Sequence, residues 1–90
     1  MILPRDAKER KATPVYTGFV KYFPKAMAAV AKISMTGGIQ HGQLPDEIFW
    51  DRSKSGDELD ALMRHMLDEE WGQVAWRAMA NLEKQLEREE

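Results

Sequence analysis

The stretch SGDELDALMRHMLD, residues 55–68, predicts an amphipathic helix. Ser55 and Glu58 match a capping box, in which each side chain satisfies a backbone N–H group of the first turn. At about 100° of rotation per residue, one face holds the large apolar side chains Leu59, Leu62, Met63, Met66 and Leu67. The opposite face surrounds the small Ala61 and holds Asp57, Glu58, Asp60, Arg64, His65 and Asp68. This charged face is either a solvated surface or the wall of a site for a charged ligand.

A second helical pattern follows at once, in EEWGQVAWRAMANLEKQLER at residues 69–88. Its apolar side chains recur at the spacing of a packing face, and they are Trp71, Val74, Ala75, Ala78, Met79, Leu82 and Leu86. Trp76 and Arg77 lie off this stripe, and we expect Trp76 to pack on the first helix or on a second subunit rather than on a ligand. Because only one or two residues separate the two helices, the pair forms either a tight antiparallel hairpin or one bent rod.

Upstream, the sequence predicts a helix over residues 24–36. Pro24 suits a first helical turn, where its missing N–H is not needed, and the pair Gly37-Gly38 is the expected stop. The following segment, IQHGQLPDEIFWDRSK at residues 39–54, has no clean period. We expect it to be a long loop, and loops of that length inside a compact domain are often functional.

The N-terminal part is less regular. Residues 1–14, MILPRDAKERKATP, are expected to form an arm that is ordered only against another surface. VYTGFVKYF, residues 15–23, is predicted to be an extended segment or a turn. The whole chain, residues 1–90, is therefore predicted to be a single all-α domain with helices at about 24–36, 55–68 and 69–88.

Length, composition and net charge indicate the class of protein and its location. Ninety residues give a thin core, and a small domain with three Trp and six Met often completes its core by homo-oligomerisation. The net charge of −2 gives no general attraction to nucleic acid. The absence of Cys excludes disulfides and thiolate sites. No apolar run reaches the roughly 20 residues that cross a bilayer, and MILPRDAKERK lacks the apolar centre of a signal peptide. A cytoplasmic protein without a membrane partner is expected.

The charged face of residues 55–68 admits two interpretations. Asp60 and Asp68 each stand four residues from Arg64, a spacing that stabilises a solvated helix surface. Asp57 and Glu58 would complement the positive end of the helix dipole. Alternatively, carboxylates and a histidine around a small residue suit a divalent metal ion, which prefers several oxygen ligands.

The long loop offers a second set of candidates. His41, in Gln40-His41-Gly42, is one of two histidines in the chain. Arg52 follows Trp50 closely, so that a guanidinium could hold a phosphate while the indole stacks on a base. The same residues also fit a core tryptophan flanked by surface charges.

Several segments taken together resemble small phage-encoded proteins described as dATP/dGTP diphosphohydrolase-like. The resembling segments, in chain order, are RDAKERKATP, TGFVKYFPKAMAAVAKIS, GGIQHG, WDRSKSGDELDALMRHMLD and VAWRAMANLEKQLE. The most specific parts are W-x-R-x-x-S-x-D-x-x-D-x-L-x-R-H-x-x-D at residues 50–68 and AWRA-x-A-x-L at residues 75–82.

This resemblance implies hydrolysis of purine deoxynucleoside triphosphates to the monophosphate and pyrophosphate, in the host cytoplasm. Mg²⁺ or Mn²⁺ would bridge the triphosphate and activate water, held by Asp57, Glu58, Asp60 and Asp68. His65 would orient or deprotonate that water, and Arg64 would neutralise charge on the phosphates. The nucleotide itself would be bound by Gln40, His41, Trp50, Arg52 and Arg77.

The chain departs from the family pattern where histidines are expected. Glu58 and Gln73 stand at two such positions, and the connection between the last two helices is shortened. These departures favour an alternative, in which the same scaffold binds or sequesters a nucleotide without hydrolysing it. A third alternative is a helical module that binds a host protein.

Overall fold

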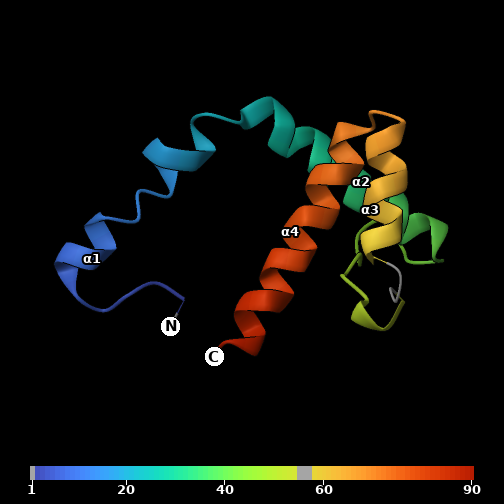
Figure 1. Ribbon diagram of the computed structural model, residues 1–90. Helices are drawn as coiled ribbons and strands as arrows, with labels where there is room; N and C mark the ends of the chain where they lie inside the picture. Colours follow the sequence, from blue (N-terminus) through green and yellow to red (C-terminus); the bar gives the residue numbers. More distant parts are fainter. Residues whose placement is uncertain (1, 55–57) are drawn as a thin grey trace.

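The computed structural model describes residues 2–54 and 58–90, and those ranges contain helices and turns but no strand (Figure 1). Four α-helices are accompanied by a π-helical turn, η1, and a 3-10 turn, η2. The elements are α1 Ala7–Lys11, η1 Tyr16–Val20, α2 Pro24–Gln40, η2 Arg52–Lys54, α3 Glu58–Leu67 and α4 Trp71–Arg88. The all-α prediction is confirmed, while the predicted number of about three helices is one too low for the described chain.

The additional helix is α1, which lies within the segment predicted to be an arm. Asp6 caps it, because its side chain accepts a hydrogen bond from the backbone N–H of Glu9 over 3.1 Å. The segment VYTGFVKYF forms the turn η1, which is the second of the two predicted alternatives, and not an extended segment. Figure 1 shows α1 and η1, in blue, standing away from the helices that follow.

The prediction that α2 ends at Gly37-Gly38 is wrong, because the helix continues to Gln40. A residue in the left-handed region usually ends a helix, and here that residue is Gly42, with φ of 82°. The backbone N–H of Gln43 then donates to the Gly38 carbonyl over 2.9 Å, the bond that defines a Schellman motif. Gly38 serves packing instead: a Cβ there would lie 2.8 Å from Oε1 of Gln43.

Helices α3 and α4 form an antiparallel hairpin (Figure 1), which decides between the two predicted arrangements. The turn places Glu69 in the left-handed region, with φ of 56°. The N–H of Glu70 donates to the His65 carbonyl over 2.9 Å, so this turn is a second Schellman motif. Helix α4 begins at Trp71, two residues later than predicted. The predicted capping box begins at Ser55, which lies outside the described residues.

Helix α4 packs on both α2 and α3, and small residues allow the close approach. Ala61 of α3 and Ala80 of α4 are buried. Gly72 of α4 lies against α2, since a Cβ built there would come 2.5 Å from Cδ1 of Ile33. In the described chain no large side chain is fully buried. The core that joins the three helices is therefore thin, as the chain length predicts.

The large apolar side chains of the hairpin face outward. On α3, Leu59 and Leu67 are 68% and 85% exposed, whereas Ala61 from the middle of the charged face is buried. On α4, Trp71 and Leu82 of the predicted packing stripe are 61% and 48% exposed. The single chain thus leaves one apolar face of each helix uncovered.

Candidate functional site

A cleft of about 570 Å³ lies between α2, α4 and the loop that follows α2. This volume lies within the range of about 300–1,000 Å³ that is usual for small-molecule sites. Apolar side chains of α2 and of the loop form part of its lining, including those of Ile33 and Ile48. Its polar and aromatic lining includes Gln40, His41, Trp50, Trp76, Arg77 and Glu83.

Two indole rings form an aromatic wall of this cleft. Trp76 of α4 donates a hydrogen bond from Nε1 to Oγ of Ser34 on α2, over 2.6 Å. Its ring meets that of Trp50 edge to face, with centroids 5.9 Å apart and an interplanar angle of 80°. The expectation that Trp76 packs on the first predicted helix is confirmed. Both rings are held in place before any ligand binds.

Cationic groups surround these indoles. The guanidinium carbon of Arg52 lies 4.2 Å from the centroid of the Trp50 ring, and Nζ of Lys84 lies 5.7 Å from it. The guanidinium carbon of Arg77 lies 5.6 Å from the centroid of the Trp76 ring. Each distance is within the range of about 6 Å for attraction between a cation and a ring face. The aromatic wall therefore carries positive charge on several sides.

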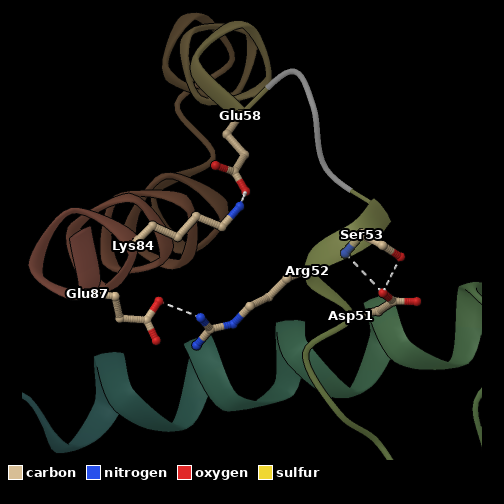
Figure 2. Close-up of polar contacts among 6 residues, drawn as sticks. All are labelled: Asp51, Arg52, Ser53, Glu58, Lys84 and Glu87. Atoms are coloured by element: carbon tan, nitrogen blue, oxygen red, sulfur yellow. Dashed lines mark hydrogen bonds and ion pairs between the residues drawn. The ribbon is translucent and has the colours of Figure 1, made fainter.

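Ion pairs connect this region to the C-terminal half of α4, as Figure 2 shows. Arg52 of η2 pairs with Glu87. Lys84 pairs with Glu58 of α3, with Nζ 2.5 Å from Oε1. The side chains of this second pair are only 21% and 13% exposed. Glu58 is thus a structural partner of α4, which competes with its predicted use as a metal ligand.

The loop beside the cleft is held by its own polar side chains. Oε1 of Gln43 accepts a hydrogen bond from the backbone N–H of Phe49 over 3.0 Å. Oδ1 of Asp51 accepts from the hydroxyl and the backbone N–H of Ser53, over 2.6 and 3.1 Å (Figure 2). These bonds fix the path on either side of Trp50. The ring position follows from an ordered loop and not from a regular element.

The charged face of α3 does not join the cleft. Asp60, Arg64 and Asp68 are exposed and, with the half-buried His65, none of them lines it. Nδ1 of His65 lies 3.0 Å from Oε1 of Glu70, a neighbouring carboxylate. Asp60 and Asp68 are eight residues apart, roughly 12 Å of helical rise, too far for one cation. Within the described residues no group of three or more His, Asp or Glu side chains could hold a metal ion.

The two predicted sets therefore have different outcomes. Four of the five predicted nucleotide-binding residues, Gln40, His41, Trp50 and Arg77, line one cleft, and Arg52 lies directly over the Trp50 ring. The predicted metal ligands Glu58, Asp60 and Asp68 are dispersed, and Asp57 lies outside the described residues. The arrangement of Glu58, Asp60 and Asp68 does not fit Mg²⁺ or Mn²⁺, and binding of either ion stays a prediction.

Sequence reasoning missed several side chains of this region, among them Glu83, Gln73 and Lys84. A signal for the first two exists in the helical period. Gln73, Trp76, Ala80 and Glu83 stand at i, i+3, i+7 and i+10, the spacing of one helix face. That face, with a buried alanine at its centre, is the one that meets α2. Lys84 carries no comparable signal, because its partner Glu58 is distant in sequence.

Comparisons with known proteins add no relative: no protein-family model, curated protein or solved structure matches the chain. Among the helices of residues 2–54 and 58–90, none is both long and apolar enough to span a membrane.

Proposed function

We propose that the cleft between α2 and α4 binds a nucleotide. The observation that carries this proposal is the convergence of two indoles, a guanidinium, three side-chain amides and one imidazole on one cleft. Indoles offer faces on which any base can stack. Arg77 supplies a charge and a forked set of donors that match a phosphate. Gln40 and His41 supply donors and acceptors for the edge of the base or for the sugar.

The resemblance described above selects purine deoxynucleotides as the first ligands to test. Binding is favoured over hydrolysis for a reason of geometry. In one chain, the described carboxylates of α3 lie on a different surface from the cleft, and Glu58 is paired with Lys84. A bound triphosphate would therefore meet none of the predicted metal ligands among the described residues.

Calorimetric titration of the full chain with dATP and dGTP tests this proposal. We expect saturable binding that falls at least about tenfold in Trp50→Leu, because stacking of one base contributes about 1–3 kcal/mol. Arg77→Met removes the phosphate partner and is expected to weaken the triphosphate more than the nucleoside. Trp71→Leu is the matched control, because Trp71 is exposed and does not line the cleft. Equal loss in the Trp50 and Trp71 variants would contradict the proposed location.

An activity assay separates binding from hydrolysis. The wild-type chain is incubated with dATP or dGTP and either Mg²⁺ or Mn²⁺, and pyrophosphate is measured. The proposal predicts nucleotide that is bound and recovered intact. Pyrophosphate release that Asp60→Asn abolishes would instead support the diphosphohydrolase function, with α3 as its metal site. If no nucleotide changes the melting temperature of the chain, the remaining hypothesis is a helical module that binds a host protein.

A further inference from the structure

The outer face of α4 is apolar and uncovered. Its side chains lie on the side of the helix that turns away from both α2 and α3. The buried Ala80 lies on the opposite side of the helix. We call this surface the α4 stripe, and it consists of Trp71, Ala75, Ala78, Leu82 and Leu86. Three of these, Trp71, Leu82 and Leu86, are exposed large apolar side chains.

The solvent-accessible surface of the chain is larger than that of a compact monomer of the same mass. The chain exposes 7543 Å², whereas a monomeric protein of 10.4 kDa exposes about 5,400 Å². The excess of about 2,100 Å² falls within the roughly 1,000–2,500 Å² that each partner contributes to an obligate homodimer. The Cα radius of gyration points the same way, since it is 15.2 Å against about 12 Å for a compact domain of this length.

The N-terminal segment accounts for much of this extension. We call residues 2–23, with α1 and η1, the arm; Figure 1 shows it standing apart from α4. The arm carries its own uncovered aromatic side chains, of which Tyr16 and Tyr22 are 64% and 67% exposed. Phe19 and Tyr22 both meet Phe23 edge to face, so these rings form one apolar cluster. An apolar arm and an apolar stripe therefore lie in one chain without covering each other.

The arm and the whole α3–α4 hairpin have net charges of opposite sign. The arm, residues 2–23, contains five basic and two acidic side chains, a net charge of +3. Residues 58–90 contain four basic and nine acidic side chains, a net charge of −5. Two of those four cations, Arg77 and Lys84, are already directed at the Trp50–Trp76 wall and at Glu58. The hairpin as a whole thus complements the arm in charge, whereas Trp71–Arg88 of α4 alone contains three basic and two acidic side chains.

We infer that this protein is a dimer formed by exchange of arms, in which the arm of each chain packs on the α4 stripe of a second copy. Exchange covers both apolar surfaces at once. It also brings each basic arm to a hairpin whose net charge is negative. The inference does not depend on nucleotide binding, because the α4 stripe turns away from the cleft.

Light scattering during size-exclusion chromatography tests the inference on the full chain. We expect a mass of about twice 10.4 kDa. Tyr16→Asp in the arm and Leu82→Asp in the stripe should each weaken the dimer at least about tenfold. Leu44→Asp is the control, because Leu44 is 58% exposed in the loop after α2, outside both surfaces. Circular dichroism verifies that each variant keeps its helices.

Mixing the two variants makes the test specific for exchange. A dimer of one Tyr16→Asp chain and one Leu82→Asp chain retains one intact arm on one intact stripe. We therefore expect the mixture to form more dimer than either variant alone. The increase in the dimer fraction on mixing can be measured even if one variant is less stable on its own.

Three results would overturn the inference. The first is a monomeric mass for the wild-type chain, which would mean that the arm closes on its own α4 or stays free. The second is a dimer that Tyr16→Asp leaves intact. The third is a mixture no more dimeric than its components, which would indicate that two stripes pack on each other directly.

Discussion

The two adjacent glycines of α2 are expected to respond to alanine in opposite directions. Both lie inside the helix, which runs to Gln40. At Gly37 an added Cβ would meet no atom within 4 Å. Alanine there should stabilise the fold by about 0.5–1 kcal/mol, because glycine in a helix interior costs that much relative to alanine.

At Gly38 the same methyl group has no room. It would lie 2.8 Å from Oε1 of Gln43 and 3.1 Å from Cγ2 of Ile48. Oε1 of Gln43 also accepts the hydrogen bond from the Phe49 N–H that holds the loop beside the cleft. Displacing it combines overpacking, about 1–3 kcal/mol, with the loss of that bond. Gly38→Ala should therefore destabilise the fold by about 1–3 kcal/mol after the gain in helix propensity.

Thermal unfolding followed by circular dichroism measures both effects. For a domain of this size, 1 kcal/mol corresponds to a change in Tm of about 4–8 °C. Gly37→Ala should raise Tm by about 2–8 °C and Gly38→Ala should lower it by at least about 4 °C. The two variants serve as controls for each other, since they make the same chemical change in neighbouring residues. Equal shifts in one direction would refute the packing of the 43–48 loop against Gly38.

Three other changes test separate contacts. Glu69→Gly should raise stability by about 0.5–1 kcal/mol, because Glu69 has φ of 56° and glycine adopts that region without strain; Glu69→Ala keeps the strain and should not, as chemical denaturation would show. Ser34→Ala should lower stability by about 1 kcal/mol in the same assay, since it removes the acceptor of the Trp76 indole; no change would mean that this bond is not formed in solution. Lys84→Met should lower the free energy of unfolding by about 1 kcal/mol, because its ion pair with Glu58, at 2.5 Å, is shielded from water. In a Glu58→Gln background the same change should have little further effect. Additive losses in the double variant would refute the coupling.

Periodic patterns predicted which segments are helical, and local geometry decided where they end. The leucines and methionines of residues 55–68 and the stripe of residues 69–88 indicated two helices and a hairpin or rod. The end of α2 was missed because Gly37-Gly38 has the composition of a stop. The residue that adopts the left-handed conformation is Gly42, which the sequence placed in a loop.

The packing faces were harder to predict for a physical reason. Large apolar residues normally indicate the buried side of a helix, but the buried apolar residues of α3 and α4 are Ala61 and Ala80. Small residues give the shortest distance between helices, and their patterns are weaker than those of leucine or methionine. Leu59 and Leu82 were assigned by the strong pattern, yet both remain exposed in the single chain. An apolar stripe can pack against a second copy of the chain as well as against the chain's own core.

The candidate cleft was partly predictable. Trp50, Arg52 and His41 were recognised from their residue types in a long loop, whereas Arg77 was implied only by the family resemblance. Their convergence could not be read from spacing, because it depends on how α2 and α4 pack and on the loop that Gln43 holds. For the charged face of α3, the helical pattern was right, but side-chain partners such as Lys84 and Glu70 were not predictable.

The indole N–H signals of the three tryptophans test nucleotide binding in the cleft most directly. In a two-dimensional nitrogen–proton spectrum of the labelled full chain, each indole gives one signal, assigned by single Trp→Phe variants. Trp50 and Trp76 line the cleft, whereas Trp71 does not. Titration with dATP should shift the signals of Trp50 and Trp76 along one binding curve and leave Trp71 in place. Saturation without movement of Trp50 and Trp76, or movement of Trp71 alone, would contradict the proposed site.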